Sequence, residues 1–365
     1  MFSFIILVSI AVVLSYLSQF KKRDVLLYVG FAVFAFIMGF QDSISVDFPG
    51  YMKDFDGILK GSVHGAFFRS QDLRGDATEY GWYLLNVIIG NVIPTFYAVS
   101  FVSCCFFCFS VASLIRDIVP AKYRWVAAIY FAVSPMIFFM SALRQGVAIG
   151  CFIFAVRGIL NKKKWYVPVL WLVAGVLFHN SMIVGIVFLL LLLLPDKLKV
   201  AYAGILSFLF VVALFFGEQY KTEFLLFSTQ FFSDNMDQYA YYLTEDESLV
   251  YSLRSIIRIA FPFVFTVIPM FKAQGKDFYY LLFFAVGQIL YALFGFQGNL
   301  QRITLYLTIF AVASFMISSN HIKNQLVNAI FIGGNLLLNI YLFMVLLSNE
   351  QYSNFLHYRT VFSIF

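Results

Sequence analysis

Charge is scarce in this sequence. Asp, Glu, Lys and Arg make up 12% of its 365 residues, against about 25% in a typical soluble domain. Hydrophobic residues make up 62%, and the mean hydropathy is +0.86. Because the interior of a globular domain cannot enclose so many apolar side chains, this composition excludes a soluble enzyme and a disordered protein. It predicts a protein whose solvent is lipid, so the formal charge of +6 does not indicate nucleic-acid binding.

Cysteine is also rare, and the four cysteines all lie inside apolar runs, which excludes a disulfide-stapled secreted domain. Cys104, Cys105 and Cys108 share one run that has no His or carboxylate neighbours, so we read them as small packing residues and not as a zinc site. The sequence has no Walker motif, no Gly-rich dinucleotide fingerprint and no His-Glu-x-x-His. We therefore expect no cofactor and no resident metal.

Long apolar runs are what the sequence has in abundance. Their lengths approach the roughly 20 residues that a spanning helix needs, whereas barrel strands alternate apolar and polar residues over about ten. The fold class predicted is an all-α integral membrane protein with about 12 transmembrane helices. The runs cover about 2–18, 25–40, 96–115, 125–140, 146–160, 165–178, 182–194, 200–217, 255–271, 278–295, 303–318 and 326–347.

The orientation of these runs follows from the basic residues. Short basic loops at 21–23, 116–124, 162–164, 197–199 and 272–276 belong in the cytoplasm. Even numbers of crossings separate them only if the short apolar piece at 81–94 does not cross, so we predict a re-entrant or interfacial helix there. Both termini and two long loops, about 41–79 and 218–253, then lie in the periplasm. The prediction is one polytopic domain, 1–365, in a bacterial inner membrane.

Ionisable residues at the outer ends of the spans are the candidates for function, because charge at a span is costly. Four arginines at one depth indicate an anion site, and the planar guanidinium favours phosphate. The alternative is that each arginine anchors lipid headgroups. His179 and Asn180 form a tight outer hairpin, where His179 is either catalytic or simply a buried histidine. The four arginines are Arg144, Arg254, Arg258 and Arg302.

Three stretches carry a resemblance to a known family. They are Val46-Asp-Phe-Pro-Gly-Tyr51 with Phe55, then Glu79-Tyr-Gly-Trp-Tyr-Leu-Leu-Asn86, and then Leu143-Arg-Gln-Gly-Val-Ala148 followed, after the Lys-rich loop, by Leu177-Phe-His-Asn-Ser181. This ordered set resembles the EpsG-type branch of the Wzy polysaccharide polymerases. The resemblance covers about residues 47–194 and implies a polytopic, GT-C-like glycosyltransferase. Such an enzyme joins undecaprenyl-diphosphate-linked repeat units into an O-antigen or exopolysaccharide on the periplasmic face.

The resemblance and the outer charges suggest one reaction, in which an acceptor hydroxyl attacks the donor's anomeric carbon and a diphosphate leaves. The four arginines would stabilise that diphosphate, and His179 would be the base, with Glu79, Asp47 and Asp237 as alternatives. A Mg²⁺ site at Asp47, Asp54 and Asp56 is a second possibility. The substrate-binding candidates are Gln145, Asp47, Tyr51, Glu79, Tyr80, Trp82, Asn180, Asp237, Tyr239, Gln297 and Asn299.

The expected partners are undecaprenyl-diphosphate-linked glycans, the lipid bilayer, a chain-length regulator and a flippase, with no nucleic acid. An O-antigen ligase is an alternative, because it would use the same arginines and histidine. A transporter or flippase for lipid-linked oligosaccharide is another, although the charges lie at the outer boundary and not at the midplane. An acyltransferase is a third, and it would need a more polar cytoplasmic opening.

Overall fold

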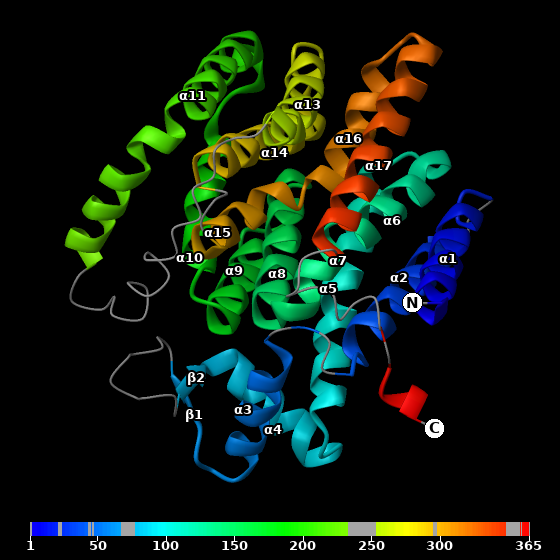
Figure 1. Cartoon of the computed structure of the whole chain (residues 1–365), viewed down its shortest axis with the longest axis vertical. Helices are drawn as coiled ribbons and strands as arrows, with labels where there is room; N and C mark the ends of the chain where they lie inside the picture. Colours follow the sequence, from blue (N-terminus) through cyan, green and yellow to red (C-terminus); the bar gives the residue numbers. More distant parts are fainter. Residues whose placement is uncertain are drawn as a thin grey trace. The chain divides into compact units, whose positions relative to one another are not determined.

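The structure is a computed structural model, and it describes residues 2–20, 24–42, 45, 47–66, 77–232, 253–294, 298–347, 358 and 360–364. Helices make up nearly all of the regular structure (Figure 1), which confirms the predicted helical class. The chain divides into two compact units. Unit 1 comprises Met1–Ile183 with Gly333–Phe365, and unit 2 comprises Val184–Ile332.

Unit 1 holds nine helices among its described residues before the boundary. They are α1 (Phe2–Leu17), α2 (Asp24–Gly39), α3 (Phe48–Leu59), α4 (Tyr80–Val92), α5 (Phe96–Ile118), α6 (Arg124–Val133), α7 (Pro135–Ser141), α8 (Leu143–Leu160) and α9 (Tyr166–Phe178). Unit 2 contains α11 (Lys199–Phe232), α13 (Leu253–Met270), α14 (Gly275–Phe294), α15 (Gly298–Thr308) and α16 (Ala311–His321). The helices α10 (Met182–Phe188) and α17 (Gln325–Leu347) cross the boundary between the units.

Several apolar helices indicate a multi-pass membrane protein, but fewer full spans are seen than the twelve predicted. Among the described residues, five helices are long and apolar enough to cross a membrane, and a sixth span results if α6 and α7, which meet at a bend of 42°, act together. Other predicted runs form apolar helices of 10–17 residues. These fall short of the roughly 20 residues that a span needs, because the apolar runs that form them, such as 25–40 and 165–178, are themselves that short.

The helices of unit 1 approach closely where glycine replaces a side chain. A Cβ on Gly30 of α2 would lie 2.7 Å from the backbone oxygen of Ala11 on α1, and one on Gly39 would lie 2.5 Å from the Cα of Phe101 on α5. Small residues at helix contacts are typical of membrane bundles, where backbones gain dispersion contacts by close approach. These contacts hold α2 between α1 and α5.

The helices α5 and α8 run side by side in the same direction. Gly150 of α8 lies against Phe106 and Ser110 of α5. Farther along, the Nε of Arg157 on α8 donates to Asp117 on α5 at 3.1 Å. In both contacts the residue of α8 is about forty positions after its partner on α5. The two helices therefore keep the same alignment between these contacts.

The predicted first outer loop is largely folded. It contains α3 and a short parallel strand pair, β1 (His64–Ala66) with β2 (Ala77–Glu79). Together with α4 they gather at one end of unit 1, below α8 and α9 in Figure 1. The helix α3 buries Phe48, Tyr51, Phe55 and Ile58, a spacing of three and four residues that is typical of an amphipathic helix.

The two ends of the chain lie near the C-terminal end of α2. Tyr358 donates its hydroxyl hydrogen to the carbonyl oxygen of Ile37 at 2.8 Å, and its ring lies 5.3 Å from the ring of Phe4. Thr360 forms a bridge with Gln41. The segments near the two termini therefore lie at the same end of unit 1 as the start of the predicted outer loop. The periplasmic location of this end of unit 1 stays a prediction.

Candidate functional site

A buried carboxylate lies at the junction of β2 and α4. Only 5% of the Glu79 side chain is exposed, and its Oε2 accepts a hydrogen bond from the Nη1 of Arg144. Thr78 supports the same pair, because its hydroxyl donates to Oε2 at 3.3 Å and accepts from Arg144 at 3.1 Å. Arg144 stands in the first turn of α8, where the helix dipole disfavours a cation. The Glu79 carboxylate offsets that cost.

The second oxygen of Glu79 meets a histidine. The Nδ1 of His179 lies 3.0 Å from the Oε1 of Glu79. An ionised carboxylate only accepts hydrogen bonds, so Nδ1 carries the hydrogen and the neutral ring keeps its lone pair on Nε2. His179 follows the last residue of α9, and 22% of its side chain is exposed. The geometry thus leaves the Nε2 of His179 as a proton acceptor.

The charge on Glu79 is secured by its partners. Burial by itself raises the pKa of Glu79, but the hydrogen bond from His179 and the positive charge of Arg144 outweigh burial and lower the pKa from 4.5 to about 2. Glu79 therefore stays ionised at any pH at which the protein works. A carboxylate with so low a pKa is a weak base, so Glu79 is better suited to orienting its neighbours.

Close helix packing brings the two halves of this cluster together. A Cβ on Gly81, two residues after Glu79, would lie 2.8 Å from the backbone oxygen of Leu177, two residues before His179. The absence of a side chain at Gly81 lets the start of α4 touch the end of α9. We name Glu79, Arg144 and His179 the carboxylate cluster.

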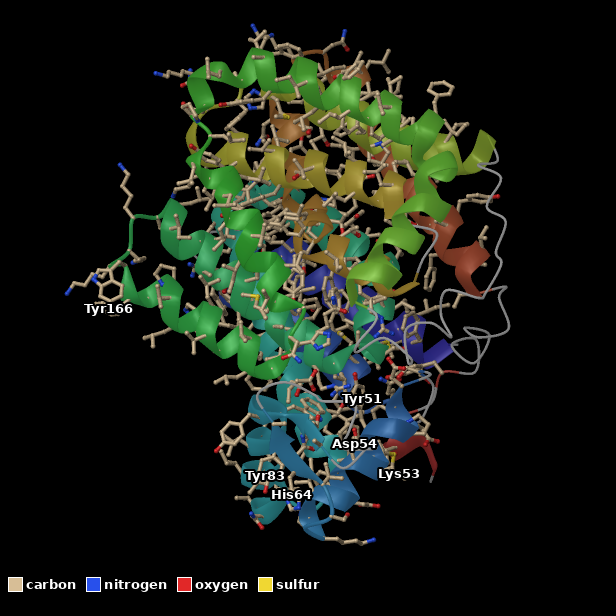
Figure 2. All side chains as sticks on the ribbon, turned by 90° about the vertical axis from the view of Figure 1, so that its left-hand side faces the viewer. Tyr51, Lys53, Asp54, His64, Tyr83 and Tyr166 are labelled. Atoms are coloured by element: carbon tan, nitrogen blue, oxygen red, sulfur yellow. The ribbon has the colours of Figure 1, made fainter. Side chains whose placement is uncertain are left out.

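Aromatic rings cover one side of Arg144. Its guanidinium carbon lies 5.3 Å from the centre of the Tyr51 ring, a cation–π distance, and Tyr51 in turn lies 5.5 Å from Trp82. Figure 2 shows Tyr51 where α3 meets the helices of the bundle, with His64 and Tyr83 farther out. Trp82 is fully buried, so in this structure it packs within the protein and presents no face to a sugar.

Several polar atoms around the cluster lack hydrogen-bond partners among the described residues. They are the Nε of Arg144, the Oδ1 of Asn180 and the indole Nε1 of Trp82. Buried polar groups without partners are uncommon in folded proteins and call for an explanation. The Nε of Arg144 and the Oδ1 of Asn180 belong to the cluster and to the residue beside His179, so a polar ligand at this site would satisfy them.

The remaining predicted site residues of unit 1 lie around this cluster at different depths. Gln145 is buried beside Arg144, Asp47 is half-buried before the first residue of α3, and Tyr80 is exposed at the start of α4. Asp54, one turn after Tyr51 on α3, interacts electrostatically with Arg144. Among the described residues, no three His, Cys, Asp or Glu side chains lie close enough together to hold a metal ion.

The other three arginines belong to unit 2, so their meeting with Arg144 stays a prediction. Arg302 is half-buried on α15. Arg254 and Arg258 lie four residues apart on α13, but their side chains are outside the described residues, as is the side chain of Asn299 on α15. Asp237, Tyr239 and Gln297 also lie outside the described part of the chain.

Sequence reasoning named Glu79, Arg144 and His179 singly but did not pair them, and it missed Thr78. One signal was available. Glu79 is the last charged residue before Arg116, so an acid stands alone at the start of a long apolar stretch. A carboxylate in that position needs a partner to remain charged.

The fold and the cluster define a class: a multi-pass helical membrane protein with a buried carboxylate that is bound by an arginine and a histidine. A family model described as the EpsG family matches residues 24–360. The chain therefore belongs to the EpsG family, which is associated with exopolysaccharide synthesis. No curated protein and no solved structure matches the chain.

The contact at Gly81 makes a testable prediction. We expect Gly81→Ala to lower glycan synthesis at least tenfold, because the new methyl group meets backbone atoms of Leu177 and moves Glu79 away from His179. Gly50→Ala is the matched control, since a Cβ at Gly50 on α3 meets nothing within 4 Å. The measurement is polymer yield per folded protein in membranes. Equal yields from the two variants would show that the α4–α9 contact does not position the cluster.

Proposed function

We propose that this protein is a polymerase that joins lipid-diphosphate-linked oligosaccharide repeat units into a surface polysaccharide on the periplasmic face. The observation that supports this most is the pair formed by Glu79 and His179, in which the carboxylate accepts the hydrogen of Nδ1 at 3.0 Å. This arrangement leaves Nε2 as a base. Glycosyl transfer to a hydroxyl is a reaction that needs such a base.

In the proposed reaction, the oxygen of a hydroxyl on the acceptor glycan forms a bond to the anomeric carbon of the donor. The bond between that carbon and the diphosphate oxygen breaks, and the diphosphate leaves with the electron pair. The Nε2 of His179 takes the hydroxyl proton and later releases it to water. Glu79 stabilises the imidazolium that forms and keeps the ring in one orientation, as a carboxylate does for histidine in other hydrolytic and transfer enzymes.

Arg144 has two tasks in this proposal. Its Nη1 binds Glu79 and Thr78, which fixes the carboxylate opposite His179. Its Nε has no partner among the described residues and is free to donate to an oxygen of the leaving diphosphate. Because the Glu79 carboxylate already neutralises the positive charge of Arg144, Arg144 by itself would bind an anion only weakly. Arg254, Arg258 and Arg302 remain the predicted cations for the rest of the diphosphate charge.

A cellular experiment separates this function from its rivals. If the gene encodes a polymerase, its deletion leaves single-repeat glycan on the cell surface. If it encodes a ligase, deletion leaves no surface glycan. If it encodes a flippase, deletion traps the lipid-linked repeat unit inside the cell. We expect the first outcome, with full-length polymer restored by the wild-type chain. Absence of all surface glycan, or accumulation of the lipid-linked repeat in the cytoplasmic leaflet, would overturn the proposal.

Replacement of Arg144 by lysine tests the geometry of the cluster. Lysine keeps the positive charge but cannot donate to Glu79 and to a second acceptor in one plane. We expect Arg144→Lys to fold and to retain about a tenth to a hundredth of the polymerisation rate, whereas Arg116→Lys on an exposed part of α5 retains all of it. The measurement is the initial rate with lipid-linked repeat unit. A wild-type rate for Arg144→Lys would show that charge alone suffices there.

A further inference from the structure

A break separates α7 from α8 just before the carboxylate cluster. The helix α7 ends at Ser141 and α8 begins at Leu143. Between them, Ala142 has a ψ of 59°, far from the roughly −42° of an α-helix. In a continuous helix the amide of Arg144 would donate to the carbonyl of Met140, four residues earlier. The break prevents that bond, so Arg144 stands at the start of a new helix and the carbonyl of Met140 needs another partner.

Two side chains from the start of the predicted outer loop bind this carbonyl. The Nε2 of Gln41 donates to the carbonyl oxygen of Met140 at 2.8 Å, and the hydroxyl of Ser45 donates to the same oxygen at 3.1 Å. Both residues are buried, with Gln41 0% and Ser45 2% exposed. A buried carbonyl without a donor is strongly unfavourable. The two bonds therefore stabilise the end of α7 at this point.

The side-chain amide of Gln41 has a partner for each of its groups. Its nitrogen faces two carbonyl oxygens, that of Met140 and that of Met38 at 3.2 Å. Its oxygen accepts from the backbone amide of Ser45 at 3.1 Å. A reversed amide would place oxygen against both carbonyls, so only one orientation satisfies all three bonds. The bond to Met38 is a local cap of α2, but the bond to Met140 joins residues 99 positions apart.

The end of α2 that precedes Gln41 is itself held in place. A Cβ on Gly39 would lie 2.5 Å from the Cα of Phe101, so α2 touches the backbone of α5 here. The C-terminal segment adds a second contact, because the amide of Val361 donates to the carbonyl of Phe40 at 3.1 Å. Gln41 therefore binds α7 from a fixed position.

We propose that Gln41 and Ser45 are positioning residues for Arg144. By binding the carbonyl of Met140 they keep the break between α7 and α8 open, and the break sets the place at which Arg144 meets Glu79. Without these two donors, the amide of Arg144 is the donor that a regular helix would supply to Met140. Formation of that bond would close the break and move Arg144 away from Glu79. The inference rests on the proposed function only for the reaction that Arg144 serves.

A matched pair of serine variants tests the proposal. Ser45→Ala removes one donor to Met140. Ser314→Ala is the control, because the buried hydroxyl of Ser314 on α16 donates to the carbonyl of Tyr280 on α14 at the same 3.1 Å. Since small displacements of a catalytic group can cost about 10²-fold in rate, we expect a kcat about threefold lower in Ser45→Ala and about 10²-fold lower when Gln41→Met is added. A double variant with the kcat of Ser314→Ala would contradict the proposal.

A double-mutant cycle with Arg144 separates positioning from general destabilisation. Residues that act through one another have non-additive effects. We expect Gln41→Met, which keeps the length of the side chain and removes its donor, to lower kcat about tenfold in the wild-type chain. In Arg144→Lys it should lower kcat by less than about twofold, because the geometry that Gln41 maintains is already lost. Equal effects in both backgrounds would show that Gln41 does not act through Arg144.

The backbone amides at the start of α8 give a measurement that needs no reaction. The amide of Gly146 donates to the carbonyl of Ala142 at 2.8 Å, which is the first bond of the α8 ladder. The amides of 143–145 come before it and so have no acceptor inside α8. Closure of the break would give them acceptors in α7. Their hydrogen exchange therefore reports whether the break is open.

Hydrogen exchange of the purified full chain, without substrate, distinguishes this inference from the proposed function. We expect exchange of 143–145 to slow at least about tenfold in Gln41→Met with Ser45→Ala and to stay unchanged in Ser314→Ala. Unchanged or faster exchange in the double variant would overturn the inference even if the wild-type chain makes polymer. Slower exchange, together with a wild-type chain that makes no polymer, would overturn the proposed function and leave the role of Gln41 and Ser45 at the break intact.

Discussion

Replacement of His179 by alanine is expected to slow polymerisation by about 10²–10⁴-fold, the contribution that a positioned general base typically makes. Expression and binding of lipid-linked substrate should stay near wild type, because His179 is partly exposed and ends α9 without filling a core position. The measurement is the initial rate of chain extension by purified protein. His64→Ala is the control, since His64 is an exposed histidine on β1.

His179→Gln separates the two roles that a histidine can have. The amide can donate a hydrogen bond to Glu79 and to a sugar, but it cannot carry a proton away. We expect His179→Gln to be as slow as His179→Ala. Activity in His179→Gln would make His179 a residue that positions the acceptor, and the base would then lie elsewhere.

Replacement of Glu79 by glutamine is expected to have the second large effect, a loss of about 10³–10⁴-fold in rate. Glutamine keeps only one acceptor oxygen, so it can accept from Arg144 or from His179 but not from both. The supporting network is broken on one side, and the buried arginine loses its counter-charge in either orientation. Removing one partner of a buried ion pair costs about 3–5 kcal/mol of stability. The measurements are the initial rate and the unfolding temperature in detergent, with exposed Asp56→Asn as the control.

A double variant distinguishes a positioning role of Glu79 from a merely structural one. Glu79→Gln with Arg144→Gln removes the unpaired buried charge, so we expect it to recover much of the lost stability but none of the activity. Full recovery of both would show that Glu79 serves only to neutralise Arg144.

The pH dependence of stability gives an independent check. Because the folded-state pKa of Glu79 is lowered to about 2 from 4.5, its contribution is fully present above about pH 4.5 and is lost as pH falls through 2. Protonation of Glu79 itself should therefore not change the stability difference between wild type and Glu79→Gln from pH 5 to 8.

Composition and hydropathy were sufficient to predict the helical membrane class, because both depend on the solvent that the side chains face. The number of full spans was not, because several apolar runs are shorter than the roughly 20 residues that a span needs. The helix α3 was missed inside a predicted loop. Lys53, Asp54 and Asp56 break up its apolar pattern, although Tyr51 and Phe55 keep helical spacing.

The carboxylate cluster was predictable only in its parts. Glu79, Arg144 and His179 were each named from the sequence, by their position at span ends and by the family resemblance. Their pairing joins residues that are 65 and 100 positions apart, which no local pattern encodes. Gly81 shows why, because the contact that brings α4 to α9 depends on a missing side chain and not on a matching motif.

The most direct test of the polymerase assignment is incubation of the purified chain with one defined repeat unit on undecaprenyl diphosphate, with a metal chelator and without nucleotide sugar. Products are separated on a gel. We expect the wild-type protein to form a ladder of regularly increasing length, and His179→Ala to leave the single repeat unit almost unextended. If folded wild-type protein leaves the substrate unextended, the polymerase assignment is contradicted. An equal ladder from His179→Ala would contradict the mechanism proposed for this cluster.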